Sequence, residues 1–346
     1  MKPRDEPKES YFFIELLRAV AAFAVIIIHV IGPYRSMIGQ IPDYDWLAAV
    51  GFNVSSRWAV PVFIMITGAL MLPDTRPFNL HIYLNRRIRR VVIPFLIWSV
   101  FYAFLAGLGW DSQGIFYDLE PALTLLAGLP EEATWYHLGF FYYFIPLYLV
   151  IPFLAPLLQK MSDDQLCMLI LGWLVLTLFY LLGVESDWMT GVIMYGGYLL
   201  LGYALVRMPL NFEQRRALFI TAGFAIVAGL YGVWDLSSAA GDYSPGMYTS
   251  YKTLNTVVVA AAVFVAAFYY GVKLQGKLRR AVYFIGHHSL GLYLFHPIVL
   301  WPIQNWELFP GLTLLTVPAV AIIVMIISLF FVWWLSKSKA TAWLVP

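Results

Sequence analysis

Three polar residues stand in the first long apolar run of the chain: Glu15, Arg18 and His29. Glu15 and Arg18 are three residues apart, so on a helix they share a face and can form an ion pair. Arg18 and His29 are eleven residues apart, which puts them on one stripe of a helix with a rise of roughly 16 Å between them. Histidine titrates near neutral pH and moves protons, whereas arginine binds anions. The pattern indicates proton transfer and anion binding, or alternatively an interfacial ion pair with one hydrogen-bonded core histidine.

The apolar run at 46–72 contains a second polar group. Asn53 and Arg57 precede Pro61, and Arg57 lies too deep in the run for its head to reach the surface easily. Pro61 cannot donate a hydrogen bond to the carbonyl of Arg57. A charged head and a free carbonyl at one depth predict a polar cavity, unless neighbouring carbonyls satisfy the arginine.

Two basic clusters precede later apolar runs. They comprise Arg86, Arg87, Arg89 and Arg90, followed much later by Lys277, Arg279 and Arg280. Guanidinium groups match phosphate oxygens in pairs, so these expected loops are candidates for holding a polyanionic ligand. Cytosolic loops of membrane proteins are also rich in Lys and Arg for reasons of topology alone.

The remaining candidates lie in two later runs. His137 and Tyr142 belong to an aromatic stretch that suits either a sugar platform or a membrane-interface belt. Ser289, Tyr293 and His296 are spaced to share one helix face, and they form either a site or a polar seam between helices.

Composition identifies the elements that must position these residues. The chain has 346 residues, of which 61% are hydrophobic and 12% charged, whereas soluble domains carry about 25% charged residues. Because each apolar run has about the length of a bilayer span, we predict one all-α domain, 1–346, a polytopic transmembrane bundle of about ten helices. The expected helices are 11–33, 46–72, 91–110, 135–158, 166–184, 189–207, 216–234, 251–273, 281–303 and 312–335. A short apolar stretch at 119–129 is expected to be interfacial or re-entrant.

The distribution of basic residues predicts the orientation. With ten helices and a cytosolic N-terminus, eighteen of the 22 Lys and Arg residues fall on the cytosolic side, and only Arg35 and Lys252 fall outside. Both termini are therefore expected to be cytosolic.

Taken in order, five motifs resemble the acyltransferase-3 family of integral membrane proteins. They are Glu15-Arg18-His29, the segment 56–68, the Arg-rich run leading to Pro94, His137-Leu138, and the segment 286–296. Three positions depart from the family pattern: Glu15 for the usual Asp, Thr67 for Ser, and Gly139 for Trp. The Arg57-Val60-Pro61 pattern is similar to the branch that includes the enterobacterial-common-antigen O-acetyltransferase.

The resemblance implies an O-acyltransferase of the bacterial inner membrane. Such an enzyme takes an acyl group, most often acetyl, from cytosolic acetyl-CoA and passes it to a hydroxyl of a cell-envelope glycan or lipid-linked sugar. It also implies that His29 is the essential histidine and Arg18 its essential partner, and that the basic clusters hold the CoA phosphates. The expected surroundings are membrane lipid, with no metal and no nucleic acid, while an oligomer is possible.

Acyl transfer to an alcohol requires a base and a stabilised oxyanion. We expect His29 to be the base and Arg57, Tyr293 or Ser289 to stabilise the oxyanion. Asn53, His137, Tyr142 and His296 are the further candidates around the substrate. Whether the acyl group crosses directly on its pantetheine arm or through a covalent relay is left open.

Two other functions fit the same residues. Intramembrane Arg and His residues and broken helices are also found in transporters, so a transporter or flippase without chemistry is the alternative. A small-ligand sensor with an acyltransferase-like fold is a third possibility.

Overall fold

The computed structural model describes residues 12–111, 114–184, 191–305 and 313–346, and it is helical throughout except for one hairpin. Eight helical segments in these residues are long and apolar enough to cross a membrane. The predicted all-α polytopic bundle is therefore confirmed. Two shorter helices, of 17 residues each, occupy the predicted spans 189–207 and 281–303.

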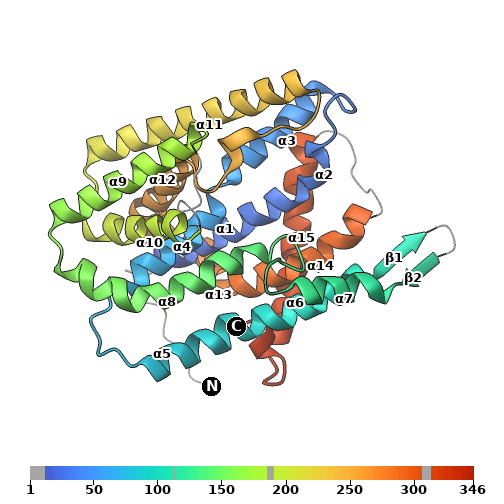
Figure 1. Ribbon diagram of the computed structural model, residues 1–346, viewed down its shortest axis with the longest axis horizontal. Helices are drawn as coiled ribbons and strands as arrows, with labels where there is room; N and C mark the ends of the chain where they lie inside the picture. Colours follow the sequence, from blue (N-terminus) through green and yellow to red (C-terminus); the bar gives the residue numbers. More distant parts are fainter. Residues whose placement is uncertain (1–11, 112–113, 185–190, 306–312) are drawn as a thin grey trace.

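The chain order of the elements is as follows (Figure 1). The first half contains α1 (Phe12–Val30), α2 (Gly32–Arg35), α3 (Asp43–Ser56), α4 (Ala59–Met71), α5 (Leu80–Arg87), α6 (Ile93–Ala106), β1 (Leu108–Asp111), β2 (Gly114–Tyr117), α7 (Leu119–Gly128) and α8 (Gly139–Lys160). The second half contains α9 (Asp163–Leu181), α10 (Gly191–Arg207), α11 (Phe212–Ala240), α12 (Leu254–Tyr270), α13 (Gly276–His287), α14 (Ser289–Asn305) and α15 (Thr313–Ser336).

The helix α1 lies at the centre of the bundle and contacts α4, α13, α14 and α15 (Figure 1). Its buried residues are almost all apolar and include Leu17, Ala21 and Val25. Its polar side chains have polar partners: Glu15 pairs with Arg18, and His29 with His296 of α14.

The predicted helix 46–72 is broken in the middle. α3 ends at Ser56 and α4 begins at Ala59, with Arg57 and Trp58 in a turn. Proline removes the hydrogen bond to the carbonyl four residues earlier and its ring crowds that carbonyl, so Pro61 accounts for a break at Arg57. The break turns the Arg57 side chain toward the interior of the bundle.

The basic run at 86–90 lies in a helix, so the prediction of a loop there was wrong. α5 begins at Leu80, where the Asn79 side chain accepts a hydrogen bond from the Ile82 N–H at 3.0 Å. The chain continues through a π-helical turn, Ile88–Val92, into α6. Pro94 occupies the first turn of α6, and such a π-turn absorbs the irregular hydrogen bonding just before it.

The predicted helix 281–303 is also two helices. α13 ends at His287 and α14 begins at Ser289, so Lys277, Arg279 and Arg280 lie on α13 and not in a loop. α13 packs closely on α1, because a Cβ on Gly286 would lie only 2.3 Å from the Glu15 carbonyl oxygen.

Glycines also set the contact between α4 and α10. A Cβ on Gly68 would lie 2.1 Å from the Leu199 carbonyl oxygen, and a Cβ on Gly202 would lie 2.1 Å from that of Met65. Only glycine permits this mutual approach of two backbones. The close crossing holds α4 and α10 together on one side of α1.

The remaining differences concern helix ends and one hairpin. The expected helix 135–158 begins only at Gly139, which leaves His137 in a turn before α8. The stretch 119–129 forms the short helix α7, preceded by a hairpin that the sequence did not predict (Figure 1). α11 is longer than the predicted 216–234 at both ends.

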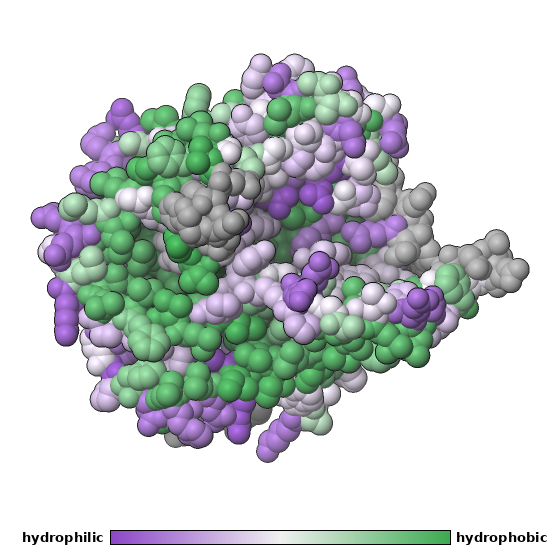
Figure 2. All heavy atoms as spheres, in the orientation of Figure 1, coloured by the Kyte–Doolittle hydropathy of each residue, from purple (hydrophilic) through white to green (hydrophobic). Residues whose placement is uncertain are grey.

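Apolar side chains cover much of the outer surface. Large exposed examples are Phe153 on α8, Met168 on α9, Phe224 on α11 and Ile326 on α15. Figure 2 shows a broad apolar area across the lower left of the molecule, with hydrophilic residues gathered at its left edge and toward the upper right. This distribution suits a helix bundle surrounded by lipid.

Candidate active site

The outer end of α1, as the basic residues predict it, carries His29 against His296 of α14. The two ring planes are nearly parallel, at 3° to one another, with centroids 5.0 Å apart, and His29 Nδ1 lies 2.7 Å from His296 Nε2. His296 is fully buried, and its Nδ1 lies 2.7 Å from the Tyr293 carbonyl oxygen. Because a carbonyl only accepts, His296 Nδ1 carries the proton and His296 Nε2 is an acceptor. His29 Nδ1–H therefore donates to it, and the Nε2 lone pair of His29 is left free.

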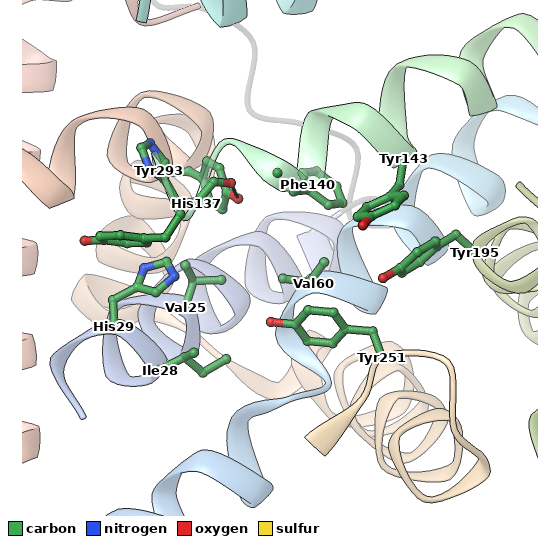
Figure 3. A pocket seen from close by; sticks show the side chains of 12 residues that line it. Val25, Ile28, His29, Val60, His137, Phe140, Tyr143, Tyr195, Tyr251 and Tyr293 are labelled. Carbon is green, nitrogen blue, oxygen red and sulfur yellow. Dashed lines mark hydrogen bonds between the residues drawn. The ribbon is translucent and has the colours of Figure 1, made fainter. Parts of the chain in front are cut away.

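A cavity of about 240 Å³ opens beside the His29 ring (Figure 3). For scale, a cavity of about 150 Å³ accommodates benzene. The lining combines α1, α4, α8, α10 and α14 with the segments before α8 and before α12: Val25, Ile28, His29, Val60, Tyr136, His137, Gly139, Phe140, Tyr143, Tyr195, Tyr251 and Tyr293. The hydroxyls of Tyr143, Tyr195 and Tyr251 point into the space between them and His29 (Figure 3).

His137 lines the same cavity and has an unusual environment. Its side chain is buried, and its ring lies within hydrogen-bonding reach of the Leu294 backbone, whose carbonyl also accepts the Tyr102 hydroxyl at 2.6 Å. Its backbone carbonyl accepts the hydroxyl proton of Tyr293. His137 is therefore held firmly in the cavity wall by the helix α14.

Arg57 does not line the cavity itself but contacts Tyr251, which does. Arg57 Nη1 lies 3.2 Å from the Tyr251 hydroxyl oxygen, to which it donates, and the guanidinium lies over the Tyr251 ring at 5.4 Å. The Tyr251 hydroxyl accepts from Arg57, so its own proton is available to the cavity. Arg57 also lies within electrostatic range of His29.

Two residues of the predicted oxyanion group, Tyr293 and Ser289, have other partners or lie elsewhere on α14. The Tyr293 hydroxyl donates its only proton to the His137 carbonyl. Ser289 is buried at the start of α14, seven residues and about 10 Å along the helix from His296. Neither residue is placed to donate a hydrogen bond beside His29.

Two other predicted substrate residues lie outside the cavity lining. The Tyr142 hydroxyl lies within hydrogen-bond distance of the carbonyls of Glu132, at 2.8 Å, and of Leu129, and it donates its single proton to one of them, so it anchors the segment between α7 and α8. Asn53 is fully buried, and its Nδ2 donates to the Tyr243 hydroxyl at 2.7 Å.

The predicted pair Glu15 and Arg18 exists and is separate from the cavity. Arg18 Nη1 lies 2.8 Å from Glu15 Oε1, and Glu15 Oε2 is buried without a partner among the described residues. Eleven residues of helix separate Arg18 from His29, a rise of roughly 16 Å. Arg18 and Glu15 therefore cannot touch the atoms that react at His29.

Arg87 contacts Tyr148, and Arg18 lies within longer electrostatic range of the same tyrosine; the three residues are here called the Tyr148 cluster. The Arg87 guanidinium lies over the Tyr148 ring at 4.9 Å. Arg86, Arg89 and Arg90 are exposed, as are Lys277 and Arg280 on α13. Arg279 lies over the Phe12 ring at 4.2 Å. Of the seven predicted donor-binding residues, only Arg87 thus belongs to the Tyr148 cluster.

Two tyrosines of the cavity were missed. Tyr195 lies on α10 and stacks on Tyr143 with ring centroids 4.6 Å apart, and Tyr251 lies in the segment between α11 and α12. Tyr195 has no sequence signal beyond its aromatic type. Tyr251 precedes Lys252, one of the two basic residues expected outside, and that position was the available clue.

Within the described residues, no cluster of three or more His, Cys, Asp or Glu side chains could hold a metal ion. A family model described as an acyltransferase domain matches residues 11–337, nearly the whole chain. Comparison with curated proteins and with solved structures finds no match.

Proposed function

The chain belongs to the acyltransferase-3 family, and from that premise we propose that it transfers an acetyl group from cytosolic acetyl-CoA to a hydroxyl of a cell-envelope glycan or lipid-linked sugar. Family membership and the apolar helices make it a multi-pass membrane acyltransferase. The transporter and sensor alternatives are therefore set aside. The bacterial inner membrane as its location is part of the proposal.

One observation carries the mechanism. His29 presents a free Nε2 lone pair beside the cavity while its Nδ1–H is held by His296. In the proposed reaction, Nε2 takes the proton of the acceptor hydroxyl as its oxygen attacks the thioester carbonyl carbon. The C–S bond then breaks, and the departing sulfur takes the proton from Nε2, giving an ester and free CoA. His296 Nε2 stabilises the transient positive charge on His29 by accepting its Nδ1–H.

Tyr251 is the best-placed donor to the oxyanion. Its hydroxyl accepts from Arg57 Nη1 at 3.2 Å and points into the cavity (Figure 3). A hydroxyl that accepts from a cation becomes a stronger donor, because hydrogen bonds in a chain polarise one another. We therefore assign oxyanion stabilisation to Tyr251 with Arg57 behind it, in place of Tyr293 and Ser289.

The tyrosine-rich lining supports a sugar as acceptor. Tyr143 and Tyr195 form a stacked pair opposite His29, with hydroxyls directed into the cavity. Aromatic faces cover the C–H face of a sugar, while tyrosine and histidine polar atoms can bond to its hydroxyls.

The Tyr148 cluster would hold the CoA phosphates. Arginine forks suit phosphates, and Arg87 lies over the Tyr148 ring, with Arg18 within electrostatic range of the same tyrosine. The donor must then span roughly 16 Å of α1 to reach His29, which the flexible pantetheine arm is suited to do. The twelve cavity residues include no Ser, Thr, Cys, Lys, Asp or Glu, so direct transfer is favoured over a covalent relay through such a side chain.

The test uses the purified protein with acetyl-CoA and a crude envelope glycan fraction. We expect free CoA to form in an acceptor-dependent way and acetyl groups to appear on the glycan. Envelope glycans from cells without the protein should carry fewer acetyl groups. A protein that binds acetyl-CoA yet changes neither quantity would refute the proposal.

A further inference from the structure

Two basic residues, Arg35 and Lys252, lie on the predicted outer side, and Arg57 lies within an apolar run; Arg35 and Arg57 contact the chain segment to which Lys252 belongs. Positive charge is disfavoured both in external loops and within the membrane, so these three residues need a reason to be there. Arg35 lies over the Tyr243 ring at 5.6 Å and Arg57 over the Tyr251 ring at 5.4 Å, both in the segment between α11 and α12. Lys252 belongs to the same segment and lies 5.2 Å from the Tyr180 ring.

Neither arginine is neutralised within the described residues. The four ion pairs found there involve other arginines, namely Arg18, Arg76, Arg207 and Arg216. The Nε atoms of Arg35 and Arg57 are both buried without a hydrogen-bond partner. Within the described ranges, the buried carboxylate of Asp45 forms no ion pair with either arginine and accepts the N–H of Thr313 at 2.6 Å.

Both guanidinium groups are connected to the surroundings of His29. Arg57 contacts Tyr251, which lines the cavity together with His29, and Arg35 belongs to the short helix that directly follows α1. Arg35 also lies near Gln304, at the C-terminal end of α14. Both side chains approach Gly32, because an added Cβ on Gly32 would lie 3.9 Å from Arg35 Nη2 and 3.9 Å from Gln304 Nε2. Gln304 Nε2 in turn donates to the His29 carbonyl at 3.1 Å.

Two uncompensated positive groups beside a general base would oppose the positive charge that the base acquires. This electrostatic repulsion is offset when an anion binds between or beside the two arginines, because opposite charges at a few ångströms attract strongly in a partly buried site. Neutral tyrosine rings hold the guanidinium planes without neutralising them. The arrangement is what an anion-binding site requires.

We propose that Arg35 and Arg57 bind an oxyanion of the acceptor, a carboxylate or a phosphate carried on the sugar that receives the acyl group. The proposal rests on the acyl-transfer function above and names the acceptor class: an acidic or phosphorylated sugar rather than a neutral one. Asn53, whose Oδ1 is buried without a partner, fixes the Tyr243 hydroxyl and so supports the ring under Arg35.

Binding can be measured without any acyl transfer. The probes are glucose 1-phosphate, methyl glucuronide and methyl glucoside, added to the detergent-purified protein without acetyl-CoA while its thermal midpoint is followed. We expect the phosphate or the carboxylate probe to raise the midpoint and the neutral glucoside to have no comparable effect. The anionic probe that raises the thermal midpoint more identifies the acceptor group as a phosphate or a carboxylate. Added salt should reduce this rise in the midpoint.

The variants are Arg35→Gln and Arg57→Gln. Each is expected to weaken binding of the anionic probe about tenfold or more. Arg216→Gln is the matched control, because Arg216 is exposed on α11 and pairs with Glu213. Arg87→Gln controls for probe binding in the Tyr148 cluster, and its response to the probe should equal that of the unmodified protein. Arg35→Lys and Arg57→Lys, which keep the charge, should retain part of the response if the Gln variants do not fold.

Equal stabilisation by all three probes would overturn the inference, as would an anionic response that survives in both Gln variants. An anionic response that is lost only in Arg87→Gln would place the binding at the donor site and would also overturn it. Because the readout is binding, an anionic preference without CoA release would refute acyl transfer alone. CoA release with no anionic preference would refute this inference alone.

Discussion

His29 Nδ1 donates to His296 Nε2 across 2.7 Å, and this contact joins the end of α1 to the middle of α14. His296 in turn is fixed by the Tyr293 carbonyl, at 2.7 Å from its Nδ1. The two bonds together set both tautomers. They leave one basic nitrogen, Nε2 of His29, at the wall of the cavity.

Replacement of His29 by Gln tests that nitrogen. Glutamine keeps a hydrogen-bonding amide but cannot accept a proton near neutral pH. We expect His29→Gln and His29→Ala to fold and to bind acetyl-CoA, while the rate of CoA release falls about 10²–10⁴-fold. His81→Gln is the control, since His81 is exposed on α5. Near-normal transfer by His29→Gln would move the search for the base to His296 and His137.

His296 is a positioning residue in this scheme. His296→Ala leaves the His29 Nδ1–H without its acceptor, and an unpaired buried donor costs roughly 1–3 kcal/mol, or about ten- to a hundredfold in rate. His296→Gln offers an amide oxygen near the lost Nε2 and should recover part of the rate. We expect kcat to change and KM for acetyl-CoA to stay constant. Equal rates in the Ala and Gln variants, or a change confined to KM, would contradict the role.

The spacing of Arg18 and His29 on one helix is fixed by helix geometry, so the sequence predicts their stripe and their separation correctly. The polar cavity near Arg57 was likewise predictable, because Pro61 disrupts hydrogen bonding within its own helix. Contacts between helices follow different rules. His29 and His296 are 267 residues apart, and their pairing depends on how α1 and α14 cross.

Those crossings are set by features with weak sequence signals. Gly286 lets α13 approach Glu15, and Gly68 with Gly202 brings α4 against α10, yet each is one of 25 glycines in the chain. The helical state of the basic run at 86–90 was missed because its charges resemble those of an ordinary cytosolic loop. The Asn79 cap was the local signal that could have revealed it.

The Tyr148 cluster predicts unequal roles for adjacent arginines. Arg87 lies over Tyr148 and Tyr83, whereas Arg86 is exposed. Arg87→Gln should therefore weaken acetyl-CoA binding about tenfold and reduce its salt dependence, while Arg86→Gln should change it little. Titration of acetyl-CoA against the purified proteins distinguishes the two. Equal effects would mean that the run contributes general positive charge only.

Gly202 predicts a packing defect that is separate from the chemistry. A methyl group at this position would lie 2.1 Å from the Met65 carbonyl oxygen, so the backbones of α4 and α10 must move apart. Overpacking of this kind typically costs about 1–3 kcal/mol. Gly202→Ala should lower the thermal midpoint in detergent. Gly172→Ala on α9, where nothing lies within 4 Å of the added Cβ, should lower it little or raise it slightly. Matching midpoints in the two variants would contradict the close crossing.

The orientation in the membrane decides which substrate meets which end of α1. Eighteen of the 22 Lys and Arg residues lie on one predicted side, and positive charge is retained in the cytosol. A reporter fused after Val345 should therefore be cytosolic, and a labelling tag near Ser244 should react from outside. The C-terminus is held to the bundle, since Trp98 Nε1 donates to the Leu344 carbonyl at 2.9 Å, so a short linker must precede the reporter. An external C-terminus would put the Tyr148 cluster on the wrong side for cytosolic acetyl-CoA and would refute the donor assignment, whatever the outcome for His29.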